Sequence, residues 1–337
     1  MNSVDISAIT LDSMLRRHAE LAEDIIRTPS IQLTSSAIGK ALGGARVFLK
    51  LECLQHTGTF KARGALSVAR SISSGDRPNG VTAASAGNHA IATAWAARKS
   101  GLSAKVVMQS TANPFRIALA KAEGAEIVLK SPGAETFGEA ERLVHEEGRT
   151  FIHPFEGPNT VLGTAGVAIE FLEDTPNLDE IVVAVGGGGL IGGIAAAVKA
   201  VKPDCAVYGV EPIGASSMSK SLEAGRPVTL EKVDTIADSL APPMALPLVH
   251  ALSQQYIDDM VCISDDSICG GLAIMQEEAK LAVEPAAAAP LAASLTALRD
   301  RLAGKTVGLV VCGTNIDGAT FAKYLDRGRH NPIDLSE

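Results

Sequence analysis

The sequence predicts an α/β fold built on parallel β-sheets, and three observations support it. Strand-like segments alternate with helix-like segments of ten or more residues, which is typical of a parallel sheet covered on both faces. Glycine-containing junctions join strand to helix at residues 85–89 and 185–190. The stretch 181–198 holds no charged residue, but its glycines would make a continuous helix costly. We therefore predict a buried strand, a glycine loop and a buried helix there, not a membrane span.

The predicted elements follow in order along the chain. Apolar residues at helical spacing predict a first helix from Leu11 to Ile25. Thr28-Pro29 ends it, because the residue before a proline avoids the α region. Strands are then predicted at residues 47–51, 80–84, 104–108, 126–129, 181–185, 206–210 and 306–311. Helices are predicted at residues 61–73, 88–100, 114–123, 136–147, 190–201 and 285–290. A new segment begins at Phe151.

Composition narrows the class of protein. A chain of 337 residues can form one large domain or two modest ones. We predict no nucleic-acid partner for three reasons. The net charge is −8, no Lys/Arg run is longer than two residues, and aromatic residues make up only 4% of the chain. Five cysteines without a C-x-x-C motif favour reduced thiols. The first residues include an acid and no apolar stretch, so we expect no signal peptide and a cytoplasmic enzyme without a membrane partner.

The first segment with chemical potential is TGTFKARGA, residues 57–65, where a loop is predicted to become a helix. The positive end of the helix dipole disfavours an ammonium group, which lowers the pKa of Lys61. A neutral lysine amine is what Schiff-base chemistry needs. Taken alone, such a lysine is more often a solvated surface charge, so the segment gains its meaning only from the other two.

The second segment is SAGNH, residues 85–89, which follows a predicted strand and opens a helix. Backbone N–H groups at a helix start bind anions, such as the carboxylate of a substrate. Asn88 offers both a donor and an acceptor. The bland alternative is a capped turn between strand and helix. We expect His89 to pack or to form a hydrogen bond and not to act as a catalytic base.

The third segment is VGGGGL, residues 185–190, in which four glycines let backbone amides enclose a phosphate group. An alternative is open here. Gly187, Gly189 and Gly192 also fit the dinucleotide pattern G-x-G-x-x-G, and Glu211 follows 24 residues after Gly187, at the end of the next predicted strand. An NAD-dependent dehydrogenase would account for this segment, but it would leave the first half of the chain unexplained.

A fourth segment, Cys312-Gly313-Thr314-Asn315, follows near the end of the chain. The four segments, in this order, resemble the fold-type-II pyridoxal 5′-phosphate (PLP) enzymes of the threonine dehydratase and serine racemase group. The likeness extends from about residue 28 to residue 317. It implies a tryptophan synthase β-like fold, with two parallel-sheet α/β domains and PLP between them. It also implies a large domain of residues 1–79 and 149–337, a small mobile domain of residues 80–148, and a homodimer.

The resemblance also implies roles for individual residues. Lys61 would carry PLP as a Schiff base and then remove the Cα proton of the substrate. Asn88 would bond to the ring hydroxyl and Cys312 would face the pyridine nitrogen. The implied cofactor-binding residues are Phe60, Lys61, Asn88, Gly186, Gly187, Gly188, Gly189, Leu190 and Cys312, and the implied substrate-binding residues are Ser85, Ala86, Gly87, Asn88 and His89.

Departures from the family pattern narrow the activity. Cys312 replaces the usual serine, and a thiol leaves the pyridine nitrogen largely unprotonated, which favours β-elimination over long-lived carbanion chemistry. Ala86 stands where racemases of the group have a serine that acts on the opposite face of Cα, so we expect dehydration in preference to racemisation. Glu211 matches part of the family's divalent-cation site, but Ser217 stands where an aspartate is usual, so no metal is predicted.

The resemblance therefore predicts a PLP-dependent ammonia-lyase that eliminates the β-hydroxyl of a small amino acid and yields a 2-oxo acid and ammonia. Threonine, serine, a 3-hydroxyaspartate-type amino acid, a phenylserine-like residue and a hydroxy acid from hydroxyectoine breakdown stay open as substrates. An acidic substrate would need an extra arginine, for which Arg63 and Arg116 are candidates. An amino acid racemase and a catalytically silent sensor on the same fold are the remaining alternatives.

Overall fold

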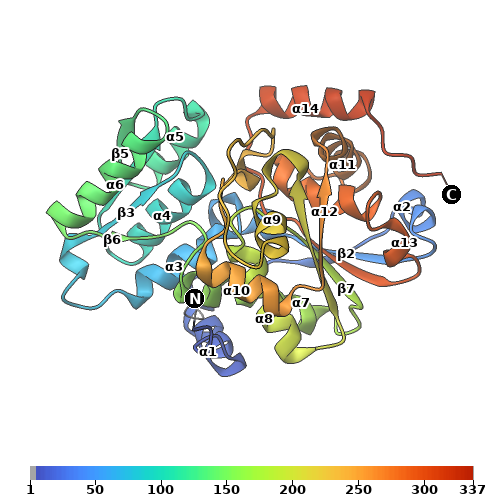
Figure 1. Cartoon of the computed structure of the whole chain (residues 1–337), viewed down its shortest axis with the longest axis horizontal. Coiled ribbons are helices and arrows are strands. Elements are labelled where there is room, and N and C mark those ends of the chain that lie inside the picture. The colour runs from blue at the N-terminus through green and yellow to red at the C-terminus, as the bar shows by residue number, and fades with distance from the viewer. Residues whose placement is uncertain (1–4, 337) are drawn as a thin grey trace.

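The computed structural model describes residues 5–336, and these form two β-sheets in two lobes (Figure 1). The six-stranded sheet has the order β1-β2-β10-β7-β8-β9 and the four-stranded sheet the order β5-β4-β3-β6. All strand pairs are parallel except β1 with β2. The predicted α/β class with two parallel-sheet domains is confirmed. No helix within residues 5–336 is both long and apolar enough to cross a membrane.

The six-stranded sheet forms the centre of the large lobe. Its strands are β1 (Ser30–Leu33), β2 (Arg46–Lys50), β7 (Glu180–Ala184), β8 (Ala206–Pro212), β9 (Asp259–Ile263) and β10 (Thr306–Val310). Every residue of β7 and β10 is buried, which explains why both appear in the sequence as continuous apolar runs. The edge strand β1 was not predicted, because none of its residues is buried and its sequence carries no clear alternation.

The four-stranded sheet forms the small lobe, at the left of Figure 1. It contains β3 (Val81–Ala84), β4 (Ala104–Gln109), β5 (Glu126–Lys130) and β6 (Thr150–Phe151), with helices α4 (Asn88–Lys99), α5 (Pro114–Ala122) and α6 (Ala134–Glu147). Strand β6 pairs with β3, so the sheet reaches slightly past the domain boundary predicted at residue 148. The division of the chain into residues 80–148 and the rest stays a proposal.

Helices of the large lobe surround its sheet. They are α1 (Leu11–Leu21), α2 (Ser36–Ala41), α3 (Lys61–Ser71), α7 (Pro158–Asp174), α8 (Gly189–Val201), α9 (Ser217–Glu223), α10 (Pro247–Tyr256), α11 (Asp265–Glu278), α12 (Pro285–Ser294), α13 (Arg299–Leu302) and α14 (Gly318–His330). Helix α1 ends before Ile25, where the prediction had extended it. The carboxamide of Gln55 explains this, since it accepts from the Ile26 N–H at 2.9 Å and donates to the Ile26 carbonyl at 2.7 Å.

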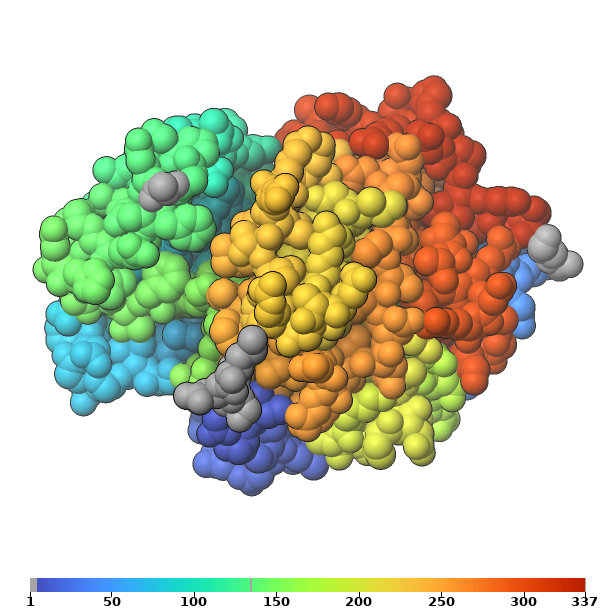
Figure 2. Space-filling view, in the orientation of Figure 1, coloured from blue at the N-terminus to red at the C-terminus, as the bar shows by residue number. Residues whose placement is uncertain are grey.

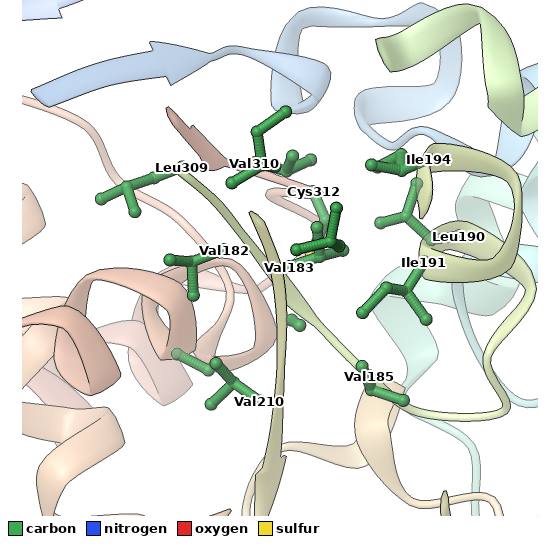
Figure 3. Close-up of a cluster of buried hydrophobic side chains, with 14 of the residues drawn as sticks. Val182, Val183, Val185, Leu190, Ile191, Ile194, Val210, Leu309, Val310 and Cys312 are labelled. Carbon is green, nitrogen blue, oxygen red and sulfur yellow. The ribbon is translucent and has the colours of Figure 1, made fainter. Parts of the chain in front are cut away.

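The core of the large lobe positions the start of α8. Side chains from β7, β8 and β10 pack against Leu190, Ile191 and Ile194 of that helix, and Cys312 lies beside this cluster (Figure 3). Helices α7 and α8 approach closely at Gly193, where a Cβ atom would lie 2.6 Å from the Val161 carbonyl oxygen. This packing fixes the glycine loop at the carboxyl end of β7, where ligands bind in parallel sheets.

A buried charge network fixes the helix that begins at Lys61. Arg63 lies fully buried in α3, with its Nε 2.8 Å from Glu52 and its Nη1 2.7 Å from Glu170. Lys50 Nζ lies 2.7 Å from the same Glu170 carboxylate. The network ties β2, α3 and α7 together through charges that have no contact with solvent. Arg63 therefore cannot serve an acidic substrate, and that candidate role was wrong.

Candidate active site

Lys61 is the first residue of α3, and its amine faces the space between the two lobes. Its Nζ donates to the Pro154 carbonyl oxygen at 2.7 Å and lies 4.9 Å from the centre of the Phe60 ring. Burial lowers the pKa of Lys61 to about 8, against the opposing effect of Cys312 and Glu284. The predicted direction holds, but burial and not the helix dipole is the main cause. A fraction of the amine is therefore neutral near physiological pH, far more than for an ordinary lysine.

The glycine loop runs from the end of β7 into α8, and its residues leave no room for side chains. A Cβ atom on Gly186 would lie 2.8 Å from the Ser239 carbonyl oxygen, and one on Gly189 would lie 2.5 Å from that of Phe155. Gly188 has a φ of +92°, which disfavours any L side chain. The loop ends at the amino terminus of a buried helix of 13 residues, where free backbone N–H groups favour a phosphate group.

Asn88 lies at the start of α4 and is held by three side chains of the large lobe. Its Nδ2 donates to the Glu284 carboxylate at 2.8 and 2.9 Å, and its Oδ1 accepts from Asn315 Nδ2 at 2.8 Å. Burial raises the pKa of Glu284. The amide of Asn88 is thus fixed in one orientation, with Nδ2 also 3.2 Å from the Ser239 hydroxyl.

Cys312 follows β10 and closes the floor of the site. Its carbonyl oxygen accepts from the Phe60 N–H and from the Thr59 hydroxyl, both at 3.1 Å. Burial raises the pKa of the Cys312 thiol well above its usual range, so the group stays neutral at physiological pH. A neutral, weakly acidic group is what the sequence predicted beside the pyridine nitrogen.

One cavity brings together all the residues predicted to bind the cofactor. Its lining includes Phe60, Lys61, Asn88, Gly186, Gly187, Gly188, Gly189, Leu190 and Cys312, together with Phe155, Ser239, Leu240 and Glu284, which the sequence reasoning did not assign to the site. Glu284 carried a signal, since it is the one charged residue between positions 281 and 293. A single acid in an apolar stretch needs a buried partner, which here is Asn88.

A second cavity, of about 340 Å³, adjoins the first and shares Lys61, Asn88 and Gly187 with it. All five predicted substrate-binding residues line it, namely Ser85, Ala86, Gly87, Asn88 and His89. On the other side, the large lobe contributes residues between Asp238 and Leu246. Figure 2 shows one face of the molecule on which the two lobes meet, with the cyan and green segments of the small lobe against yellow and orange segments of the large lobe. The cavity is therefore built from both lobes.

Two histidines beside Lys61 are neutral and serve as structural hydrogen-bonding groups. His89 Nε2 donates to the Ile152 carbonyl oxygen at 2.7 Å, and burial lowers the pKa of His89 to about 3. His153 Nδ1 accepts from the backbone N–H groups of Phe155 and Glu156 at 3.2 and 2.9 Å, and burial lowers the pKa of His153 to about 4. Neither adds a positive charge to the cavity at physiological pH, in accordance with the expectation for His89.

Arg116 of α5 joins the small lobe to the large lobe at the wall of the second cavity. Its guanidinium bonds to Asp238, and its Nε donates to the Asn315 carbonyl oxygen at 3.0 Å. Glu284 lies 3.8 Å from the same guanidinium. Because Arg116 already faces two carboxylates, its charge is compensated before any substrate enters.

Glu211 lies away from the site and its carboxylate is fully engaged. It accepts from the N–H groups of Met218 and Ser219, each at 2.8 Å, and from the Ser219 hydroxyl at 2.6 Å. Burial raises the pKa of Glu211 to about 7. This engagement leaves no free oxygen for a ribose, which argues against the dinucleotide alternative. Within residues 5–336 there is no group of three or more His, Cys, Asp or Glu residues that could hold a metal ion.

The fold and these two cavities define an enzyme that holds a phosphorylated cofactor between two lobes. The chain belongs to the family of pyridoxal-phosphate dependent enzymes, which matches residues 21–313. The predicted family, tryptophan synthase β-like fold and PLP cofactor are confirmed, and the dehydrogenase alternative is set aside.

Known proteins similar to this chain include a dehydratase, an ammonia-lyase and a racemase. The chain is 43% identical over 329 residues to a phenylserine dehydratase of Ralstonia pickettii, covering 97% of this chain and 100% of that protein. It is 35% identical to an L-threonine ammonia-lyase of Thermotoga maritima, covering 95% of this chain and 79% of that one. The solved structure of maize serine racemase matches with a TM-score of 0.89 at 31% identity, covering 95% and 98% of the two chains. The dehydratase and the ammonia-lyase agree with the predicted ammonia-lyase class, and the serine racemase matches the racemase alternative.

Proposed function

We propose that this protein eliminates the β-hydroxyl group of a β-hydroxy amino acid and releases a 2-oxo acid and ammonia. The observation that carries the proposal is the Lys61 amine, which has a pKa lowered to about 8 and lies where the two cavities join. The names of the relatives support the reaction class, since they cover dehydration or deamination of phenylserine and threonine.

The residues of the first cavity fit PLP by their chemistry. The loop of Gly186, Gly187, Gly188 and Gly189 would hold its phosphate through backbone N–H groups. Asn88 would bond to its ring hydroxyl, and the neutral Cys312 thiol would face its ring nitrogen. When bound, PLP supplies the electron sink that accepts the electron pair left at Cα of the substrate.

Lys61 is proposed to be the general base that takes the Cα proton. A base is most effective when its pKa lies near the working pH, and burial brings Lys61 to that range. The N–H groups at the start of α4, beside Ser85 and Gly87, would bind the substrate carboxylate and fix Cα close to Nζ.

Elimination is favoured over racemisation at this site. Ala86 offers no group that could return a proton to the second face of Cα. Loss of the hydroxyl as water leaves an enamine, which takes up water again to give the 2-oxo acid and ammonia. Contacts between the lobes, such as Arg116 with Asp238, would restrict the entry of water before that step.

The decisive experiment uses the purified protein loaded with PLP. We expect a visible absorption band that disappears on borohydride reduction, a phosphopyridoxyl group on the peptide with Lys61, and release of ammonia from β-hydroxy amino acids. Lys61→Ala should abolish all three results, whereas Lys232→Ala, at an exposed position, should leave them unchanged. Ammonia release by Lys61→Ala at the wild-type rate would refute the proposal. Loss of optical purity in recovered substrate without ammonia release would favour the racemase alternative.

The homodimer and the cytoplasmic location rest on the resemblance and on the composition alone. We infer that the enzyme acts as a homodimer on a small-molecule amino acid. Sedimentation of the purified protein tests this inference, because a single species with the mass of one chain would contradict it.

A further inference from the structure

Part of the wall of the second cavity is apolar and comes from both lobes. The large lobe contributes Pro242, Pro243, Met244 and Leu246, and the small lobe contributes Phe137 of α6. Phe137 is 57% exposed in the structure, although a phenylalanine gains most when its ring is buried. Together with the apolar residues on the opposite side of the cavity, this ring offers an apolar surface that a ligand could cover.

The charges around this cavity are already compensated. Its titratable and charged lining groups are Lys61, His89, Arg116, His153 and Asp238. Both histidines are neutral, and Arg116 is paired with Asp238. Lys61 is the proposed reaction base. An acidic substrate side chain would therefore lose its hydration without finding a free cation, which costs several kcal/mol in a buried site.

The second cavity has a volume of about 340 Å³. The first cavity has only about 30 Å³, so PLP would take up part of the second cavity and leave the rest to the substrate. For comparison, an apolar cavity of about 150 Å³ is large enough to bind benzene. The methyl group of threonine or the hydrogen of serine would leave most of the apolar wall uncovered.

We propose that this site selects β-hydroxy amino acids with an aryl group on Cβ, and that Phe137 with residues 242–246 forms the wall that binds the aryl ring. The inference rests on the proposed β-elimination and names its substrate class. Because Phe137 belongs to the small lobe and residues 242–246 to the large lobe, an aryl ring would contact both. The 3-hydroxyaspartate-type substrate is the least suited of the candidates, since Arg63 is buried elsewhere and Arg116 is paired.

The test measures kcat/KM of the PLP-loaded enzyme for 3-phenylserine, threonine, serine and 3-hydroxyaspartate by 2-oxo acid formation. We expect phenylserine to exceed threonine by at least about tenfold, and hydroxyaspartate to be the poorest substrate. Phe137→Ala should reduce the phenylserine-to-threonine ratio by about tenfold, mainly through KM for phenylserine. Phe115→Ala removes another exposed phenylalanine of the same lobe, one that does not line the cavity, and should leave the ratio unchanged.

The possible outcomes separate this inference from the proposed function. Preference for threonine or serine, or an unchanged ratio in Phe137→Ala, would overturn the aryl selectivity and leave β-elimination standing. If no 2-oxo acid forms from any member, the proposed function fails. In that case the change in visible absorbance on titration with each amino acid still gives its Kd, and tighter binding of phenylserine that weakens in Phe137→Ala would support the aryl wall independently of turnover. Equal Kd values for all four amino acids would overturn it.

Discussion

Arg63 carries its charge in the interior two residues after Lys61, and its partners explain how the fold tolerates it. Both Glu52 and Glu170 accept from its guanidinium through two oxygens each. Arg63→Ala would remove this cation from two buried carboxylates, after which Glu170 keeps Lys50 and Glu52 keeps only the Thr28 hydroxyl as a side-chain partner. We expect the free energy of unfolding to fall by about 3–5 kcal/mol, measured by urea denaturation of the PLP-loaded protein.

The matched control is an arginine in an exposed network. Arg142 pairs with Glu139 and Glu146 on the surface of α6. Arg142→Ala should change the free energy of unfolding by no more than about 1 kcal/mol. Similar losses in the two variants would show that burial of the Arg63 network contributes no special stability.

The pKa of Lys61 makes cofactor attachment dependent on pH. The neutral amine is the form that reacts with an aldehyde, and burial lowers the pKa of Lys61 from its usual 10.5 to about 8. The rate at which protein freed of cofactor takes up PLP should therefore rise with pH and reach half its maximum near pH 8. Rapid mixing followed by visible absorbance measures this rate. A midpoint near the ordinary lysine value would contradict the burial of this amine.

Single residues differ in how well the sequence reveals them. Lys61, Asn88 and the glycines lie in segments whose local pattern has a chemical reason, and the structure brings them together around one cavity. Ser239 carries no such local signal, and Asn315 lies in the segment 312–315 that contributes to the resemblance but was assigned no role. Their importance depends on contacts with Asn88 from positions more than 150 residues away, and no spacing along the chain predicts contacts of this kind.

Helix α8 contains two neighbouring glycines, Gly192 and Gly193, whose substitution by alanine should change the stability of the protein in opposite directions. A Cβ atom on Gly193 would meet the Val161 carbonyl oxygen at 2.6 Å, whereas one on Gly192 would meet Leu252 at an ordinary 3.5 Å. Gly193→Ala should therefore force α7 and α8 apart and destabilise the protein by about 1–3 kcal/mol. Gly192→Ala should stabilise it by about 0.5–1 kcal/mol through helix propensity. Thermal unfolding of both variants, with PLP bound, provides the measurement.

Equal melting temperatures for these two variants would contradict the close approach of α7 and α8. The comparison is sharp because both substitutions add the same methyl group to the same helix, one residue apart.

At the level of elements, the sequence predicts helices well where a predicted strand and a loop precede them. Helices α3, α4 and α5 match their predicted ranges to within two residues at either end. Helix α7 was missed because its residues from Thr160 to Leu172 are buried and show no amphipathic period, and because, unlike the equally buried α4 and α8, it follows no predicted strand. Strand β1 was missed for the opposite reason, since its residues are all partly or fully exposed.

For the whole molecule, buried neutral histidines predict sensitivity to acid. His89 has an ordinary pKa of 6.5 when unfolded and about 3 when folded. Below pH 6.5 the unfolded chain binds a proton that the folded protein does not, so stability falls as the pH decreases from 6.5 towards 3. This one residue should contribute a loss of about 1.4 kcal/mol per pH unit in that window.

Urea denaturation at several pH values checks this slope against His89→Gln, whose amide can keep a hydrogen bond to the Ile152 carbonyl but does not titrate. The slope between pH 6 and pH 4 should be shallower in the variant by about 1.4 kcal/mol per unit. Parallel pH profiles for the two proteins would show that His89 is protonated in the folded state.

The arrangement of the two lobes was predictable only from the resemblance, since no local pattern marks where one sheet ends and the other begins. The segment from Asp238 to Leu246 shows the limit most clearly. It forms one wall of the substrate cavity, yet its sequence contains no regular element longer than a single turn. Its position is set by the packing of Leu240 and Ala245 in the core of the large lobe, and Asp238 adds a contact with Arg116 of the small lobe.

The small sheet is inserted within the sequence of the large lobe, so the chain passes between the lobes twice, before β3 and after β6. One connection would let the lobes turn about any axis, whereas two restrict them to a hinge. The second connection includes Pro154, whose carbonyl holds the Lys61 amine, and Phe155, whose ring covers Gly187. Any hinge motion of the predicted small mobile domain would therefore also move the residues that contact Lys61 and the glycine loop.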